Sequence, residues 1–294
     1  MKLKPWQYLG YPLILITLAL VAYGFLKEDE HIGVWVAPAF ILLAVVYVMS
    51  PQIDYWWYKR NPPPLDLPIQ RLIDEHFLYY KNLNAELKQR FRERLALYVM
   101  GNEFIRPVNK EDSTAMADRN RVPEDLKAAA AAHAIQVSFG REKYMTEKFE
   151  HIIIYPHPFP SPQYNYLHTS EIFEEDGVLL LTSDPMMIGF QTPQNFFSIG
   201  LYEYARIYKM LNPSVSFPNL VENTWWDLEQ VSGMSKAAIE KVVGLEDLDL
   251  FGVAAHHFFT FPDRMLKLMP DLYTLLSNVF NQNPVNGANP ILNA

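Results

Sequence analysis

The chain has 294 residues, of which half are apolar and a fifth charged, and its 33 acidic side chains outnumber its 25 basic ones to give a net charge of -8. This composition excludes a disordered or fibrous chain, and the acidic balance argues against a nucleic-acid-binding surface, so no nucleic-acid partner is expected. The absence of cysteine excludes disulfides, iron–sulfur clusters, thiolate zinc sites and cysteine nucleophiles.

Two apolar runs predict a transmembrane helical hairpin over residues 1–60. The first extends from Pro5 to Leu26 and the second from His31 to Ile53, and neither contains Asp, Glu, Lys or Arg. Each is long enough to cross roughly 30 Å of hydrocarbon as a helix, and aromatic residues flank the pair as an interfacial belt does. A cleaved signal peptide is the alternative for the first run, but no small-residue cleavage site follows it. The lipid bilayer is therefore an expected partner.

Basic residues predict the orientation of this hairpin. Lys2 and Lys4 precede the first run, Lys59 and Arg60 follow the second, and the connection between the runs has one Lys against three acidic residues. The positive-inside rule then places both ends of the hairpin in the cytoplasm. We expect two spans and a cytoplasmic C-terminal domain.

The remainder of the chain predicts an α+β domain, mainly helical with a small sheet, because few short strands occur among several helices. Residues 61–68 are a proline-rich linker, 69–284 form the domain, and 285–294 are expected to be a loose tail. Apolar spacing, turn residues and caps predict the elements. The predicted helices are Ile69–Met100, one beginning at Pro123, one from Thr192-Pro193 to about Leu211, Asp249–Phe259 and Asp271–Gln282, and the predicted strands are Glu150–Tyr155 and Gly177–Thr182.

Five segments occur in an order similar to that of one peptidase family. They are the alanine-rich helix before the first strand, Ile154–Phe159 (IYPHPF), Gly177–Ser183 (GVLLLTS), Asp249–Phe259 (DLFGVAAHHFF), and Pro270–Tyr273 with Gln282–Pro284. From Phe91 to Pro284 the chain resembles the Mlc titration factor A family of bacterial zinc peptidases, also called glucose-regulated metallopeptidases. The resemblance implies a zincin-like fold and, with the apolar runs, a location in the bacterial inner (plasma) membrane.

The chain departs from this family at the metal-binding helix. Family members carry His-Glu-Phe-Ala-His, where two histidines bind zinc, the glutamate is the general base, and a later carboxylate is the third ligand. Here the matching segment reads Tyr202-Glu203-Tyr204-Ala205-Arg206, and Asp249 matches the third ligand. A tyrosine is a poor ligand at neutral pH and an arginine stays protonated, so Tyr202 and Arg206 do not replace the histidines. No metal and no other cofactor is expected.

These residues also have ordinary structural interpretations. Glu203 and Arg206 stand three residues apart, which is the spacing of a common helix ion pair. His256 replaces a family glutamate, and a relocated metal held by His256 and Asp249 is a minor alternative, because about 10 Å of helix axis separates them. The adjacent pair His256-His257 is interpreted as one packed and one solvated histidine, since neighbours on a helix point about 100° apart.

The family resemblance, together with the loss of both zinc-binding histidines, predicts a membrane-tethered pseudopeptidase. Such a protein would bind an unknown protein or peptide in a regulatory role. One alternative is an active zinc peptidase with unconventional metal ligation, and another is a non-enzymatic membrane scaffold.

The resemblance also gives two structural predictions. The segment Gly177–Leu181 should be an edge strand lining a groove, with Gly177, Leu179, Leu181 and His256 as possible groove residues. Arg206 should stand in for the lost metal, within hydrogen-bonding distance of Asp249 or Glu203.

Overall fold

The computed structural model describes residues 4–27, 33–107, 121–286 and 289–290, and the chain divides into two compact units, Met1–Pro63 and Pro64–Ala294. The described residues are mainly helical with a small sheet, so the predicted α+β class is confirmed.

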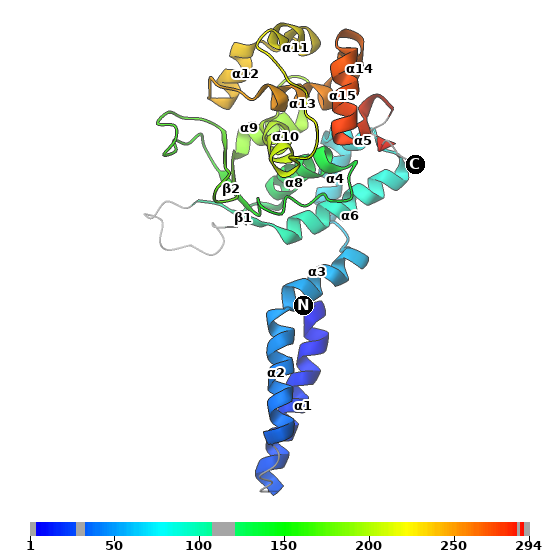
Figure 1. The fold of residues 1–294 in the computed structure, drawn as a ribbon, viewed down its shortest axis with the longest axis vertical. Helices are drawn as coiled ribbons and strands as arrows, with labels where there is room; N and C mark the ends of the chain where they lie inside the picture. Colours follow the sequence, from blue (N-terminus) through cyan, green and yellow to red (C-terminus); the bar gives the residue numbers. More distant parts are fainter. Residues whose placement is uncertain (1–3, 28–32, 108–120, 287–288, 291–294) are drawn as a thin grey trace. The chain divides into compact units, whose positions relative to one another are not determined.

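The first unit consists of α1 (Pro5–Lys27), α2 (Gly33–Val48) and α3 (Ser50–Arg60), with α1 and α2 side by side (Figure 1). The buried residues of α1 include Gly10, Thr17 and Gly24, which recur every seven residues and so share one helix face. Small side chains on such a face let two helices approach closely. Within the described residues, α1 is the single helix that is long and apolar enough to span a membrane by itself.

The second apolar run, which we predicted to be a span, is divided between two helices. Helix α2 ends at Val48, and the chain then bends by 58° into α3, so the two helices reach the length of a span only as a bent pair. Pro51 explains the break, because its ring carries no N–H to continue the backbone hydrogen bonds of α2. Asp54 of α3 accepts a hydrogen bond from the Trp6 N–H at 2.9 Å, which ties α3 to the first turn of α1.

The second unit begins with a group of helices where one long helix was predicted. The predicted helix over 69–100 is three: α4 (Leu67–His76), α5 (Leu78–Lys81) and α6 (Ala85–Gly101). Phe77 has an extended backbone between the first two, and the Asn84 side chain caps α6 by accepting from the Leu87 N–H at 2.9 Å. Local backbone and capping choices thus override the regular apolar spacing.

Of the remaining helices, α8 lies between β1 and β2 in the chain, and the others follow β4. They are α8 (Glu124–Ser138), α9 (Ser183–Gln191), α10 (Ile199–Leu211), α11 (Thr224–Ser232), α12 (Lys236–Val243), α13 (Leu250–Thr260), α14 (Pro262–Leu268) and α15 (Pro270–Phe280). The predicted start of α10 at Thr192 is wrong: Thr192 caps the end of α9, and Ser198 caps α10, accepting from the Leu201 N–H at 3.4 Å. The helices predicted at Pro123, Asp249 and Asp271 are confirmed within one or two residues.

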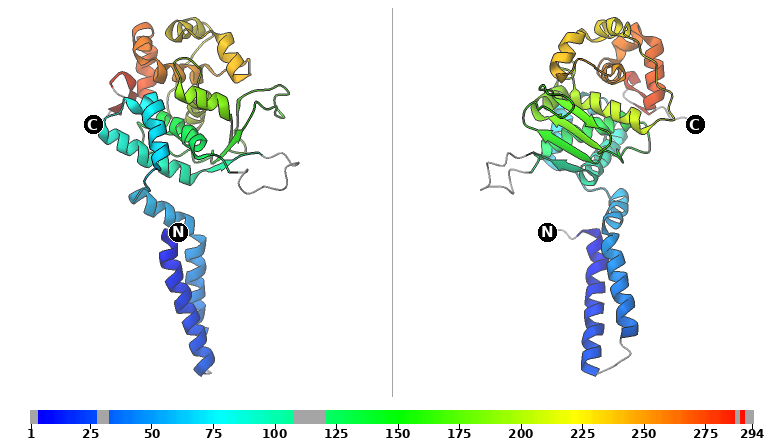
Figure 2. Two further views of the ribbon diagram at one scale, coloured as in Figure 1. Left: turned by 180° about the vertical axis from the view of Figure 1, so that it is seen from behind. Right: turned by 60° about the vertical axis from the view of Figure 1, so that its left-hand side comes forward.

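Four strands form the main sheet, in the order β1-β2-β4-β3. Their bounds are Glu103–Ile105 (β1), His151–Tyr155 (β2), Ser170–Phe173 (β3) and Val178–Thr182 (β4). The first, second and fourth are parallel, and β3 runs antiparallel to β4 at the edge. The right-hand view of Figure 2 shows the four strands beside the helices of this unit.

Helix α10 is the centre of the second unit. It packs against α8 and α13 on two sides and also contacts β3 and β4. Helices α11–α15 gather on the side of α10 away from α6 (Figure 1). The C-terminal segment is not wholly a loose tail, since η1 covers Pro284–Asn286 and β6 (Asn289–Pro290) pairs with β5 (Gln282–Asn283).

Candidate functional site

The segment Tyr202–Arg206, compared above with a metal-binding motif, lies within α10. All of Ile199–Ala205 is buried, because α8, α13 and the sheet cover this part of the helix. The helical repeat then directs successive side chains to different neighbours: Glu203 reaches β3, while Tyr202 and Arg206 meet α13.

Glu203 is fully buried and both of its carboxylate oxygens are bonded. Oε1 accepts from the Ser170 hydroxyl of β3, and Oε2 accepts from Nη1 of Arg206, each at 2.7 Å. Burial raises the pKa of this carboxyl, while the Arg206 charge and the Ser170 hydrogen bond act in the opposite direction. The prediction that Arg206 lies within hydrogen-bonding distance of Asp249 or Glu203 is confirmed, and the partner is Glu203.

Arg206 lies along Tyr202 at the contact with α13. Its guanidinium carbon is 5.3 Å from the centre of the Tyr202 ring, and its side chain keeps 24% of its accessible surface. Burial lowers the pKa of Arg206, but the neighbouring Glu203 carboxylate and the further acidic groups outweigh it, so the pKa is raised. Arg206 is therefore a permanent cation beside a buried carboxylate.

Asp249 is engaged differently from the prediction. Its Oδ1 accepts from the Gly252 N–H at 3.0 Å, which makes it the N-cap of α13, and its Oδ2 pairs with Lys209 at 3.3 Å. The Asp249 N–H donates to the Tyr202 hydroxyl at 3.0 Å. The two carboxylates therefore have different cationic partners, Arg206 for Glu203 and Lys209 for Asp249.

Gly252 permits this close contact between α10 and α13. A Cβ atom at Gly252 would lie 2.7 Å from Cδ2 and 2.8 Å from Cε2 of Tyr202, and 3.2 Å from Cγ of Arg206. Contacts below 3 Å to an aromatic ring require the helices to separate. The glycine is therefore a steric requirement of the Tyr202–Arg206 arrangement, which the sequence alone did not reveal.

The histidines of α13 are both buried, so the expectation of one solvated histidine is wrong. His257 donates from Nδ1 to the Val253 carbonyl at 2.8 Å and accepts at Nε2 from the Ser232 hydroxyl at 2.7 Å. Nε2 of His256 has no hydrogen-bond partner, and its ring packs 4.5 Å from that of Phe197. Burial lowers the pKa of His256 well below its ordinary value and that of His257 to about 4.

The donor set does not fit the zinc that the family resemblance implies. Glu203 uses its two oxygens for Ser170 and Arg206, and a divalent cation there would lie beside the guanidinium charge. Across the part of the chain that the structure describes, no group of three or more His, Asp or Glu side chains is arranged to hold a metal ion.

The predicted groove strand is in the middle of the sheet. β4 pairs with β2 on one side and β3 on the other, so the prediction that Gly177–Leu181 forms an edge is wrong. Leu179 and Leu181 are fully buried, and Gly177 has a φ of +64° with the Lys148 carbonyl against it. The strand at this edge of the sheet is β3. It lies between the two predicted strands, β2 and β4, in the sequence, but in the sheet it forms a hairpin with β4 and lies outside both.

A cavity of about 600 Å³ accompanies this edge. It is lined by Ile172 and Phe173 of β3, by the acidic turn Glu174–Asp176, and by Lys148 and Gln163. Lys148 pairs with Glu174 at 3.3 Å, which leaves two acidic side chains of the turn without an ion pair among the described residues.

Comparison with protein-family models finds no match to this chain, and comparison with curated proteins finds none either.

Proposed function

We propose that this chain is a membrane-tethered, non-catalytic relative of zincin-like peptidases that binds an extended, basic peptide or protein segment. The observation that carries the proposal is the 2.7 Å hydrogen bond from Arg206 to Glu203, at the positions where a zinc peptidase has its second histidine and its general base. The positively charged Arg206 side chain neutralises the buried Glu203 carboxylate, as a bound metal ion would.

The arrangement around Glu203 supports a relationship to such peptidases. The motif helix α10 lies against a sheet whose edge strand is antiparallel, and Ser170 of that strand contacts Glu203. The later helix α13 supplies Asp249 at its N-terminus, near Tyr202, in the order that the family motifs imply. These contacts join α10 to β3 and to α13, and the last of these is one of the segments that carry the resemblance.

The position of β3 at the end of the strand order, with Ile172 and Phe173 partly exposed, supports peptide binding. An extended peptide adds to a free sheet edge through main-chain hydrogen bonds, and neighbouring pockets select its side chains. Here the cavity beside Ile172 and Phe173 offers apolar surface, and the acidic turn Glu174–Asp176 offers negative charge. The complementary occupant is a peptide that alternates apolar and basic residues.

The location that we propose is the cytoplasmic face of the bacterial inner membrane, with two spans. Asp54 holds α3 at the first turn of α1, so residues 4 and 60 lie at the same end of the first unit. Reporter fusions after Lys4, at Glu28 and after Arg60 should read inside, outside and inside. An outside signal after Arg60 would place the domain among envelope proteins and would overturn the cytoplasmic assignment.

Metal analysis tests the non-catalytic part of the proposal. The detergent-solubilised chain should purify without stoichiometric zinc after dialysis against zinc, and it should not cleave peptide libraries. The double variant Tyr202→His/Arg206→His should gain zinc, while either single variant should not, because one change leaves either the cation or a missing ligand. Stoichiometric zinc in the wild-type chain that a chelator removes would support an active peptidase with unconventional ligation instead.

Peptide binding tests the second part. Fluorescence anisotropy with labelled peptides that alternate Lys and Val should show binding that weakens with added salt. The variant Glu175→Lys/Asp176→Lys should weaken it, while the control Glu147→Lys, outside that cavity, should not. If no peptide binds, the fully buried Glu203 favours the alternative of a membrane scaffold without a ligand groove.

A further inference from the structure

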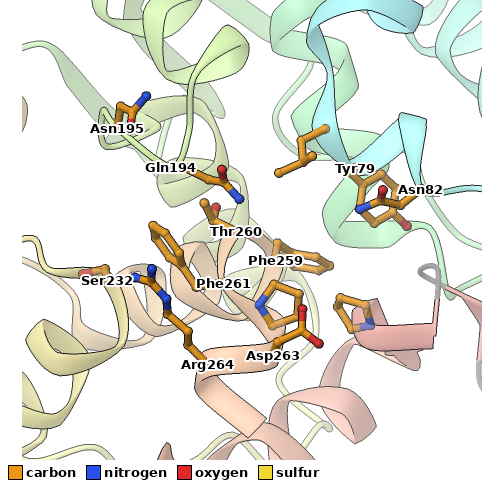
Figure 3. Close-up of a pocket in the computed structure, with 13 residues that line it drawn as sticks. Tyr79, Asn82, Gln194, Asn195, Ser232, Phe259, Thr260, Phe261, Asp263 and Arg264 are labelled. Carbon is orange, nitrogen blue, oxygen red and sulfur yellow. The ribbon is translucent and has the colours of Figure 1, made fainter. Parts of the chain in front are cut away.

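A second cavity, of about 420 Å³, lies at the C-terminal end of α13 (Figure 3). Its walls come from α5, the turn after α9, and the ends of α11 and α13, and its rim comes from the first turn of α14. Three side-chain amides line it, those of Asn82, Gln194 and Asn195. None of its residues belongs to the sheet or to the motif segment of α10, so this cavity is separate from the site described above.

Two charges of opposite sign line this cavity on different sides. Asp263 and Arg264 are neighbours on α14, and adjacent residues on a helix do not face each other. Arg264 extends toward Ser232, where its Nη1 meets the Val231 carbonyl at 3.5 Å. Asp263 lies on the side of Asn82, and Gln194 is drawn across Thr260 from the two charged residues in Figure 3.

Both charged groups keep most of their bonding capacity. In the described part of the chain, neither Asp263 nor Arg264 has an ion-pair partner, and both are exposed. Arg264 uses one of five N–H donors, in one long hydrogen bond, while its guanidinium rests 5.7 Å from the centre of the Phe261 ring. A planar guanidinium held on an aromatic ring is well placed for a carboxylate.

The cavity lies at the C-terminal end of α13, from which Phe259 and Thr260 line it. The helix ends at Thr260, where the Phe261 N–H closes its last turn on the His257 carbonyl at 2.8 Å. Pro262 has no N–H, so the Phe258 carbonyl lacks the donor that a continuing helix would supply. Unbonded carbonyls at a helix C-terminus favour a cation, as does the Asp263 carboxylate.

We propose that this cavity binds a small zwitterion, a free α-amino acid or a dipeptide, with its ammonium group at Asp263 and its carboxylate at Arg264. The three amides then hydrogen-bond the ammonium, the carboxylate or, in a dipeptide, the peptide group, and Phe259 and Phe261 contact the apolar part. This proposal does not rest on peptide binding at β3, because the two cavities share no residue.

Calorimetric titration of the full chain in detergent tests the proposal. The probes are L-alanine and L-alanyl-L-alanine, each compared with its N-acetylated form and with its C-terminal amide. One of the zwitterions should bind, and both capped forms should bind at least about tenfold more weakly, because each removes one charged hydrogen-bonding group. The comparison of the two zwitterions identifies the length that fits.

Variants assign each charge to its side chain. Asp263→Asn should weaken zwitterion binding and remove the discrimination against the acetylated form, whereas Arg264→Gln should remove the discrimination against the amide. Asp271→Asn and Lys267→Gln are matched controls on exposed positions outside the cavity, and they should leave the affinity unchanged. Absence of binding at concentrations on the order of 10 mM would overturn the proposal. Equal binding of the capped forms, or equal weakening by the controls, would also overturn it.

Discussion

Replacing Arg206 by alanine tests the ion pair at the centre of the second unit. Glu203 is fully buried, and Arg206 supplies the only cation bonded to it among the described residues. The variant Arg206→Ala leaves the Ser170 hydroxyl as the remaining donor to the carboxylate. A buried carboxylate without a counter-charge either stays ionised, with no interaction to replace its lost hydration, or takes up a proton.

The expected loss of stability follows from what the variant leaves behind. Removing one partner of a buried pair destabilises a protein by roughly 3–5 kcal/mol. Because the Arg206 side chain keeps 24% of its surface exposed and water can enter the space that it leaves, we expect about 3 kcal/mol, the lower end of that range. The loss should depend on pH. Without Arg206 the folded-state pKa of Glu203 rises further, so the variant is more stable at low pH and loses stability as the pH rises through that value.

The assay is urea unfolding of the solubilised chain, followed by tryptophan fluorescence at several pH values. Lys209→Ala is the matched control, because Lys209 pairs with Asp249 with 43% of its side chain exposed, and such surface pairs contribute about 1 kcal/mol or less. Glu203→Gln/Arg206→Met should recover part of the stability of Arg206→Ala, since it removes the unpaired charge. If Arg206→Ala unfolds like Lys209→Ala, with no change in pH dependence, the idea that Arg206 neutralises Glu203 is refuted.

Three further substitutions or conditions test the packing around this pair. Gly252→Ala should lower the free energy of unfolding by about 2 kcal/mol, because its methyl group would lie 2.7 Å from the Tyr202 ring; an unchanged urea midpoint would contradict the close approach of α10 and α13. Tyr202→Phe should cost about 1 kcal/mol through loss of the acceptor for the Asp249 N–H, measured in the same way. Acid should destabilise the domain between pH 6.5 and 4, because burial lowers the pKa of His133 and His257 to about 4 and only the unfolded chain binds their protons in that window. The loss should reach about 2–3 kcal/mol for each histidine, and His257→Gln should flatten the pH dependence of unfolding, whereas a variant of the exposed His157 should not.

The sequence determined the features that depend on local composition. A long uncharged apolar run can be stable as a membrane span whatever surrounds it, so the first helix was predictable to within a residue. Apolar spacing predicted α13 to within a residue, whereas the N-cap role of Asp249 came only from the structure. The spacing of Glu203 and Arg206 on one helix was enough to predict their hydrogen bond, because three residues bring side chains together on any α-helix.

Tertiary structure decided which strand lies at the sheet edge and which groups meet at the site. Strand order depends on pairing between distant segments, and the short strand β3, with only four residues, carries too little periodicity to be recognised beforehand. For the same reason the sequence could not assign Ser170 to Glu203 or Lys209 to Asp249, since each pair joins different elements. The steric role of Gly252 and the separation of Asp263 from Arg264 around a cavity also depend on how helices pack, which no local pattern encodes. Local propensity determines the helices and strands of this protein, while the contacts between them determine which polar and charged groups meet.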